Sequence, residues 1–512
     1  MRRRRYLAAL ASGALAGCSH PRHDSTPTVA ADTPNVVQIL VDDLGWADVG
    51  AYQELVPEED RPPGYGFHET PNVDRLAAEG TLFTDGYAAS PICSPTRASL
   101  YTGQATPRHG ITDRHDTGVT KGALVSPRSA STVPRDTPTQ ARLLRRAGYR
   151  TIHLGKWHVS EKPPDVRPGD VGFETNVAGF HWGRPRQGYV CPYGMPGLDC
   201  SGEEYLTRRL TEVAVERIED VSADRPFFLN LAFYSVHTPI EAPDPVVDRF
   251  RVKRRAMGLP EGPVTTDGQR TVQSNATYAA MIAEMDRAVG RVLDAIDDLE
   301  RPTIVLFHSD NGGLATVGSR SPTSSLPLER GKGWPHEGGI RVPTIVRWPG
   351  MTGGGIERTP VVTQDLYTTA LGAAGVDLPD PDDHPVDGVD LRPLLAGEGL
   401  DDRAIGFHYP HYAVQGSTPA GAIRRGPYKL IEFFEDGHVE LYNVAEDPGE
   451  TVELSRAAPR LAEELRHALR EWRDDVGARM PTPNPDFEGE VSPGRFYERR
   501  PASSPLVDSG RR

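Results

Sequence analysis

Short runs of β-branched and apolar residues recur along the chain and are separated by amphipathic stretches. The first run, Val-Val-Gln-Ile-Leu-Val at residues 36–41, has the length and composition of a buried strand. Similar runs at residues 149–154, 227–233 and 303–308 predict three further strands. Buried strands that lack a polar face are typical of sheets covered on both sides.

Helical patterns lie between these runs. Residues 72–79 form one, with Pro71 near its start and Gly80 after its end. Longer amphipathic stretches cover residues 137–147 and 278–299. Because strands and helices alternate, we expect an α/β fold with a large, mostly parallel or mixed central sheet flanked by helices. We assign this large domain, which we expect to be the catalytic one, to residues 35–400.

The pattern changes after residue 400. Short runs at residues 422–425, 428–434 and 438–442 are separated by Gly-Pro and Glu-Asp-Gly turns, which predicts an antiparallel meander. An amphipathic helix is predicted over residues 459–476. Residues 401–480 therefore form a smaller C-terminal α+β domain in this interpretation. Residues 481–512, rich in Pro, Ser and Arg, are expected to be a loosely ordered tail.

The N-terminal residues have a pattern typical of a targeting segment. Arg2–Arg5 precede a short apolar stretch that ends in Leu-Ala-Gly-Cys at Cys18, so residues 1–18 are predicted to be a secretory signal. The ending resembles a bacterial lipoprotein box, which would make Cys18 a lipidated residue and the protein's contact with the membrane. An ordinary cleaved signal is the alternative. Residues 19–34 are expected to be a flexible tether, and the protein to be exported to the periplasm or cell surface.

The amino-acid composition limits which classes of binding partner are expected. The 512 residues include 57 Lys and Arg against 71 Asp and Glu, for a net charge of −14. Such a surface repels phosphate backbones, so no nucleic-acid partner is expected. Four cysteines are too few for a disulfide scaffold. Cys191 and Cys200 flank a Pro/Gly-rich loop, and the sequence leaves open whether they pair.

Acidic residues follow two of the predicted strands. Asp42-Asp43 come directly after residues 36–41, and Asp310-Asn311 come just after residues 303–308. The carboxyl ends of parallel strands share one edge of a sheet, where such folds place ligands. Oxygen ligands of this kind suit a hard cation, Ca²⁺ or Mg²⁺. The alternative is that one pair caps a helix and the other makes a turn.

The remaining cysteine carries the most specific motif. Cys93-Ser-Pro-Thr-Arg97 fits Cys-x-Pro-x-Arg and is followed by Leu-Tyr-Thr-Gly at residues 100–103. This segment resembles the type I sulfatases of the alkaline phosphatase superfamily. The resemblance implies that a maturation enzyme oxidises Cys93 to formylglycine (3-oxoalanine), whose hydrated aldehyde is the nucleophile. A buried structural cysteine in a turn is the alternative.

Further segments match the same family in order, across about residues 35–455. They are Gly-Lys-Trp-His at 155–158, the segment 233–239 around His237, the segment 331–343 around Lys332, and the C-terminal segment 441–450. The resemblance implies these catalytic residues: Cys93, Arg97, Lys156, His158, His237 and Lys332. It implies substrate contacts by Lys156, His237, Lys332 and His336. It implies metal ligands at Asp42, Asp43, Cys93, Asp310 and Asn311, with Ca²⁺ preferred to Mg²⁺.

The leading hypothesis is an exported sulfatase that hydrolyses sulfate monoesters of a sulfated carbohydrate or an aryl compound. In this scheme Lys156 and Lys332 stabilise sulfate oxygens, His158 takes a proton, and His237 or Lys332 assists the leaving oxygen. Two alternatives remain. One is a phosphonate monoester or phosphodiester hydrolase with the same motif. The other is a non-catalytic surface protein that binds a sulfated ligand.

Overall fold

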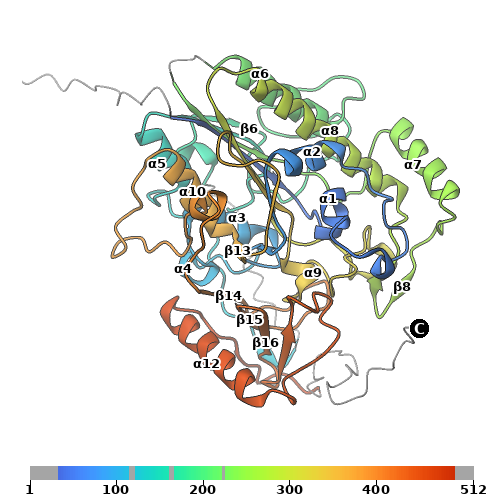
Figure 1. Ribbon diagram of the computed structural model, residues 1–512, viewed down its shortest axis with the longest axis vertical. Helices are drawn as coiled ribbons and strands as arrows, with labels where there is room; N and C mark the ends of the chain where they lie inside the picture. Colours follow the sequence, from blue (N-terminus) through green and yellow to red (C-terminus); the bar gives the residue numbers. More distant parts are fainter. Residues whose placement is uncertain (1–32, 115–121, 161–165, 222–224, 490–512) are drawn as a thin grey trace, which may run out of the picture.

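A computed structural model of the chain describes residues 33–114, 122–160, 166–221 and 225–489 (Figure 1). The predicted signal, Cys18 and all but the last two residues of the predicted tether therefore lie outside the described residues. Within the described ranges, no helix is both long enough and apolar enough to cross a membrane.

The core of the molecule is one eight-stranded mixed sheet. In spatial order its strands are β12 (Gly355–Glu357), β2 (Thr81–Phe83), β11 (Thr344–Arg347), β10 (Thr303–Ser309), β1 (Asn35–Val41), β7 (Phe227–Ala232), β5 (Arg150–Gly155) and β6 (Thr175–Val177). The five strands from β10 to β6 are parallel. Strand β11 is antiparallel to both β10 and β2. The four strands predicted from apolar runs lie next to one another in the middle of this sheet.

Both faces of the sheet are covered, which explains why apolar residues of β1 point to both sides. Val37, Ile39 and Val41 share one buried cluster with α1 (Gly50–Gln53), α2 (Pro71–Glu79), α6 (Leu206–Glu219) and α8 (Ala276–Asp297). Val36 and Leu40 point to the other face and pack with α3 (Cys93–Thr102), α5 (Gln140–Arg146), α10 (Thr363–Ala373) and α11 (Arg392–Leu395). Successive side chains of a strand point to opposite faces, so both positions are apolar.

Side chains define the ends of the predicted helices. Asn275 accepts hydrogen bonds from the backbone N–H groups of Thr277 and Tyr278, so α8 begins at Ala276. The Thr139 side chain accepts from the Arg142 N–H, which starts α5 later than the predicted residue 137. Both helices are confirmed, with ends shifted by a few residues.

A separate four-stranded antiparallel sheet follows. Its order is β14 (Ala404–Tyr409), β15 (Ala420–Arg425), β16 (Tyr428–Phe433) and β17 (Val439–Asn443). Helix α12 (Pro459–Asp475) packs on it through a cluster that includes Ile423, Leu430, Leu441, Leu465 and Leu469 (Figure 1, red helix at the bottom). The predicted C-terminal sheet and helix are confirmed, and β14 is an additional strand.

The first residues of the expected loose tail pair with a distant segment. Strand β18 (Thr482–Pro483) pairs with β4 (Leu124–Val125), and the Asn484 N–H donates to the Ala123 carbonyl at 2.8 Å. Backbone hydrogen bonds to a distant segment therefore hold this part, a long-range pairing that Pro-rich composition does not reveal. Residues 490–512 lie outside the described residues.

The remaining elements are short, apart from α7. They are α4 (Thr106–His109), α7 (Asp244–Ala256), α9 (Glu337–Ile340), the pair β3 (Gly86–Tyr87) and β13 (Val361–Val362), and the pair β8 (Thr265–Thr266) and β9 (Gln269–Arg270).

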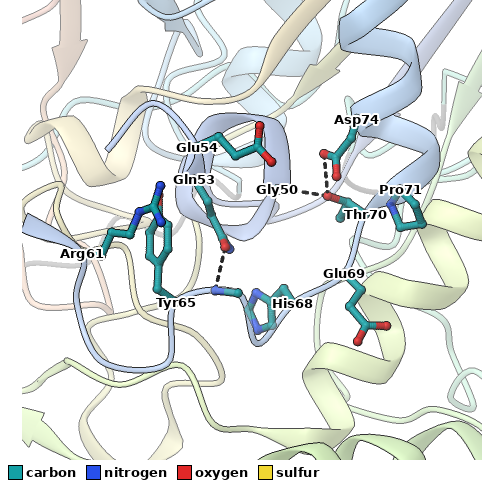
Figure 2. Close-up of a pocket in the computed structure, with 11 residues that line it drawn as sticks. Gly50, Gln53, Glu54, Arg61, Tyr65, His68, Glu69, Thr70, Pro71 and Asp74 are labelled. Carbon is teal, nitrogen blue, oxygen red and sulfur yellow. Dashed lines mark hydrogen bonds between the residues drawn. The ribbon is translucent and has the colours of Figure 1, made fainter. Parts of the chain in front are cut away.

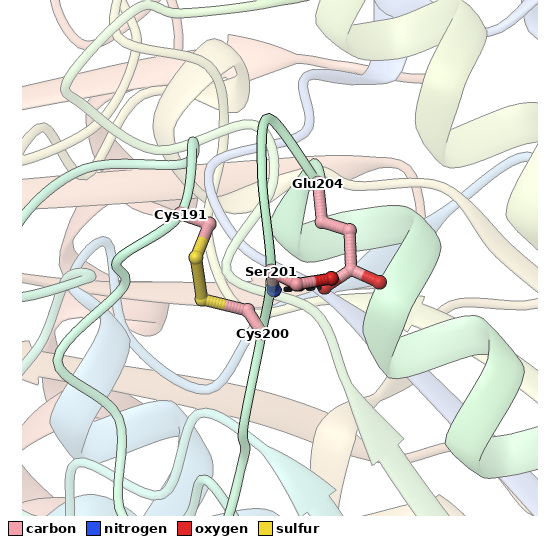
Figure 3. The surroundings of a disulfide bond; sticks show 4 residues. All are labelled: Cys191, Cys200, Ser201 and Glu204. Atoms are coloured by element: carbon pink, nitrogen blue, oxygen red, sulfur yellow. Dashed lines mark hydrogen bonds between the residues drawn. A yellow bond between two sulfur atoms is a disulfide. The ribbon is translucent and has the colours of Figure 1, made fainter.

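One disulfide closes a surface loop. Cys191 and Cys200 are bonded with a Cα–Cα distance of 5.9 Å, and Figure 3 shows them beside Ser201 and Glu204. This settles the pairing that the sequence left open. Cys93 is a free, buried cysteine.

Candidate active site at the carboxyl edge of the sheet

The two acidic pairs meet because β1 and β10 are adjacent and in register. Val41 pairs with Ser309, so the next residues of both strands leave the sheet together. The Asp43 N–H donates to Asp310 Oδ1 at 3.2 Å, and Asn311 Nδ2 donates to Asp43 Oδ1 at 2.8 Å. Asp42, Asp310 and Asn311 are fully buried and Asp43 is 2% exposed. The sequence prediction that these side chains converge is thus reproduced by the geometry.

A buried cation lies against each of the three carboxylates. Lys156 Nζ is 2.6 Å from Asp42 Oδ2, and Lys332 Nζ contacts Asp43 Oδ1. Arg97 donates through Nε to Asp310 Oδ2 at 2.8 Å. Charges buried this deeply need such partners, because desolvation of an unpaired ion costs several kcal/mol.

Three different elements deliver these cations. Arg97 lies one turn after Cys93 in α3, on the same helical face. Lys156 directly follows β5, whose last residue, Gly155, has φ +95°, and a Cβ there would lie 2.0 Å from the Ala232 carbonyl oxygen. Glycine is therefore required for the turn that sends Lys156 to Asp42. Lys332 is held by its N–H, which donates to the Gly313 carbonyl at 2.9 Å.

Burial and mutual repulsion act on the carboxylates together. Burial raises the pKa of Asp42 well above its ordinary value, and the nearby Asp310 and Asp43 add to the rise against Lys156. Burial also disfavours the charged form of Asp43, but Lys332 and His237 outweigh it and lower its pKa. For Asp310, Arg97 and Lys156 outweigh burial in the same way. Further positive charge at Asp42 would stabilise its ionised form.

Cys93 is the first residue of α3 and is 2% exposed. Its Sγ lies 3.4 Å from His158 Nδ1. The loop before it is tied to the Lys332 loop, since the Gly333 N–H donates to the Pro91 carbonyl at 2.9 Å. The thiol also belongs to a buried cluster with Tyr409 of β14, so the C-terminal sheet completes its surroundings.

His237 lies beside the acidic pair. Its Nε2 is 3.8 Å from Asp43 Oδ2, and its Nδ1–H donates to the Thr238 carbonyl at 2.8 Å. Burial is the main reason that its pKa falls to about 3. Ligand atoms of Asp42, Asp43 and His237 all lie within 4.8 Å of one another. The sequence-based assignment of His237 to catalysis and substrate binding stays a prediction, and this grouping adds His237 to the residues that could hold a metal ion.

His336 lies at a domain boundary. It is 1% exposed, and its Nε2 is 3.1 Å from Glu440 Oε2 on β17. The next residue, Glu337, is fully buried and contacts Lys429 Nζ at 2.7 Å, while the Glu337 N–H donates to Glu450 Oε2. Nothing in the sequence pointed to Lys429, Glu440 and Tyr409, because no short-range pattern indicates a contact formed across about a hundred residues or more. A substrate contact by His336 stays a prediction.

The acidic edge fits a hard cation. Asp42 Oδ1 and Asn311 Oδ1 are buried and have no hydrogen-bond partner. Buried polar atoms are almost always hydrogen-bonded, so two such oxygens in one cluster fit a site that can hold a cation. Carboxylate and amide oxygens are the donors that Ca²⁺ and Mg²⁺ prefer.

A further pocket of about 450 Å³ lies near α1 and α2, away from these residues. Figure 2 shows Gln53, His68 and Asp74 among its lining side chains. None of the predicted site residues lines it. His68 Nδ1 lies 3.2 Å from Asp48 Oδ1, so this pocket reaches the back of the segment that follows Asp43.

Comparison with known proteins decides the family. The sulfatase family model matches residues 34–376, and a model of the C-terminal region of N-sulphoglucosamine sulphohydrolase matches residues 331–475. The chain belongs to the sulfatase family. It is accordingly a sulfuric ester hydrolase, and the sequence-based recognition is confirmed.

Relatives of this sulfatase cover most of its length. It is 32% identical to N-acetylgalactosamine-6-sulfatase of Canis lupus familiaris, over 78% of this chain and 72% of that protein. It is 31% identical to human arylsulfatase A, over 86% of this chain and 87% of that protein. Among solved structures, the fold is similar to the crystal structure of Ps i-CgsB in complex with k-i-k-neocarrahexaose, with a TM-score of 0.69. The two sequences are 28% identical, and the match covers 87% of this chain and 93% of that one. The predicted fold class is therefore confirmed.

Proposed function

We propose that this sulfatase hydrolyses sulfate monoesters of a sulfated carbohydrate, using a formylglycine made from Cys93 and one divalent cation, Ca²⁺ rather than Mg²⁺. The observation that carries the proposal is the convergence at one sheet edge. Cys93, its histidine neighbour and three carboxylate–cation pairs come from segments up to about 290 residues apart. They nevertheless lie together, and two of the cations, Arg97 and Lys332, interact electrostatically with Cys93. The saccharide bound by the relative Ps i-CgsB supports a sugar substrate.

A formylglycine at residue 93 and the cation would supply what the unmodified side chains lack: a hydroxyl nucleophile and extra positive charge for the sulfate oxygens. Asp42, Asp43, Asp310 and Asn311 would hold the cation, with residue 93 beside them. Lys156 and Lys332 offer ammonium groups to the sulfate oxygens as charge moves from sulfur to the leaving group. Arg97 fixes Asp310 and keeps its carboxylate oriented.

The two histidines are suited to different protons. His158 Nδ1 lies 3.4 Å from Cys93 Sγ, so it can take a proton from a hydroxyl at that position. His237 donates its Nδ1–H to the Thr238 carbonyl, which leaves Nε2 as an acceptor. An acceptor cannot protonate a leaving oxygen. Of the two candidates for that step, we therefore assign it to Lys332.

The test is direct. Cys93→Ala should lower kcat on 4-nitrophenyl sulfate by at least about 10³-fold, since nucleophile removal leaves only binding and charge stabilisation. Mass spectrometry of the peptide containing residues 92–97 should show an aldehyde in the active wild type. Ser94→Ala is the matched control, because it keeps Cys-x-Pro-x-Arg and should be matured and active. Wild-type turnover by a protein whose residue 93 is still a thiol would refute the proposal, and a higher kcat/KM on a phosphonate monoester would favour the alternative reaction.

Export is part of the proposal. The Cys191–Cys200 disulfide supports it, because such bonds persist in oxidising compartments. The Leu-Ala-Gly-Cys sequence supports a lipid on Cys18. Fractionation of cells that express the protein should place it in the membrane pellet, and Cys18→Ala should release it. Retention of the variant in the membrane would contradict the anchor.

A further inference from the structure

The loop of residues 180–188 lies between the two histidines of the candidate site. At its start, the His158 N–H donates to the Phe180 carbonyl at 3.2 Å. Just after its end, the Tyr189 hydroxyl donates to the His237 carbonyl at 2.8 Å. The 180–188 loop is thus held between the two histidine segments, one of which contacts Cys93 through His158.

Gly183 of this loop packs against the imidazole ring of His158. A Cβ on Gly183 would lie 2.4 Å from His158 Cε1, so the loop backbone packs directly on the imidazole that contacts Cys93. Glycine permits this approach because it has no side chain. The residues on either side, Trp182 and Arg184, consequently begin next to the catalytic imidazole.

The side chains of the 180–188 loop are aromatic and cationic. The Arg186 guanidinium lies 4.4 Å from the centre of the Trp182 ring, and that ring packs edge-on against Phe180. Arg184 and Arg186 are exposed. Neither forms an ion pair with a carboxylate in the part of the chain that the structure describes. On a protein of net charge −14, two arginines without an acidic partner beside the site are available to an anion.

The 180–188 loop packs against the neighbouring loop of residues 191–200. The Gln187 N–H donates to the Tyr193 carbonyl at 3.2 Å, and a Cβ on Gly194 would lie 3.4 Å from Arg186 Cβ. The Cys191–Cys200 disulfide (Figure 3) closes a loop. By sequence position, Tyr193 and Gly194 belong to this loop. The stacked Trp182 ring and this closed loop restrict Arg186, which lowers the entropy lost when its planar guanidinium binds a ligand.

We propose that Arg184 and Arg186 bind a second anionic group of the substrate, so that this enzyme prefers sulfated saccharides with several negative charges over singly charged sulfate esters. Sulfate and carboxylate oxygens match the forked N–H donors of arginine. This inference rests on the proposed function, since it assumes that the ester to be cleaved lies at residue 93. Arg184 and Arg186 are therefore specificity residues rather than catalytic residues.

The experiment compares two probes by calorimetry on the full chain carrying Cys93→Ala, which prevents turnover. Sucrose octasulfate presents many anionic groups on a saccharide, whereas inorganic sulfate presents one. We expect octasulfate to bind at least about 100-fold more tightly than inorganic sulfate. Arg184→Gln with Arg186→Gln should weaken octasulfate binding at least tenfold and change inorganic sulfate binding less than twofold. Trp182→Leu, which removes the stacked ring, should weaken octasulfate binding about threefold.

Arg291→Gln is the matched control, an exposed arginine on α8 that should change neither affinity. The inference is overturned if octasulfate does not bind, if the double variant binds it within twofold of the parent, or if the control loses as much. Turnover of 4-nitrophenyl sulfate by the wild type is measured separately. Absence of turnover would count against the proposed function. The comparison of binding affinities tests the second anion site separately.

Discussion

At the candidate site, each of the three buried carboxylates contacts a buried cation, yet Asp42 Oδ1 and Asn311 Oδ1 accept no hydrogen bond. The pairs Asp42–Lys156, Asp43–Lys332 and Asp310–Arg97 come from six separate positions in the chain. In such an arrangement the buried charges compensate one another, so the loss of one side chain leaves its partner as an uncompensated buried ion. Two predictions follow at this scale, one for the cation and one for Lys332.

The cation should stabilise the folded protein. After chelation, addition of Ca²⁺ should raise the Tm of the wild type, because a ligand of the native state at 100 times its Kd contributes about 2.7 kcal/mol. Asp43→Asn should lose this shift, while Asp294→Asn, on an exposed carboxylate, should retain it. Differential scanning calorimetry provides the measurement. An identical Tm with and without the cation would argue against a metal at this edge.

Lys332→Met should lower kcat about 10²-fold, since it removes a cation placed to stabilise developing charge. Lys253→Met is the control, because that lysine pairs with Glu69 near the surface. Steady-state kinetics on 4-nitrophenyl sulfate, with circular dichroism to verify folding, would check both variants. A kcat within threefold of the wild type in folded Lys332→Met protein would remove this residue from the mechanism.

The sequence anticipated residues of two kinds at this scale. Asp42 and Asp310 were expected from local pattern alone, because each follows an apolar strand at the edge where ligands bind. Lys156, His158 and Lys332 needed the family resemblance, since nothing in a lone lysine or histidine indicates its surroundings. Arg184 and Arg186 gave no signal, because their meaning depends on a glycine packed against a distant imidazole.

At the scale of elements, the short helix α9 joins the two sheets. Its first residue, Glu337, accepts from Tyr87 of β3 at 2.8 Å and contacts Lys429 of β16 at 2.7 Å. Lys429 also lies 2.8 Å from Glu450. The carboxylate therefore connects the segment that carries Lys332 to the C-terminal domain.

Lys429→Met should lower the free energy of unfolding by about 3 kcal/mol, the cost of leaving a buried charge without its partner. Adding Glu450→Gln to this variant should recover part of the loss, because it removes one of the two carboxylates that contact Lys429 in the wild type. Urea denaturation followed by fluorescence measures both. A loss below about 1 kcal/mol for the single variant would show that Arg341 and Tyr87 compensate Glu337 unaided.

The central strands were predictable and the edge strands were not. Strands β1, β7, β5 and β10 are six or seven residues long and wholly or almost wholly buried, so composition marks them. Strands β2 and β12 have three residues each and β11 has four, too few for a periodic pattern. Tertiary pairing rather than local preference defines them.

At the scale of the whole molecule, buried histidines link stability to pH. Burial lowers the pKa of His153 and His109 to about 3 and that of His408 to about 4. In the unfolded chain these groups bind protons near pH 6.5. Between about pH 6.5 and 4 the unfolded state thus binds more protons, and the free energy of unfolding falls as the pH falls.

Each such histidine contributes a slope of about 1.4 kcal/mol per pH unit within this window. Urea titrations at pH 7, 6 and 5 should show the decrease, and His408→Gln should reduce the slope by about one third of the part due to these three groups. His467→Gln is the control, because its side chain is 68% exposed. Stability that is constant from pH 7 to 5 would contradict this linkage.

The long separation of Asp43 and Asp310 also has a consequence for biosynthesis. The two residues are 267 positions apart, so at ordinary ribosomal rates about 15–50 s pass between their synthesis. Until β10 emerges, β1 lacks its neighbour on one side and half of the acidic cluster does not exist. During that interval Cys93 has neither the Lys332 loop nor Tyr409 around it. The nascent polypeptide thus exposes the very sulfur atom that the finished enzyme conceals.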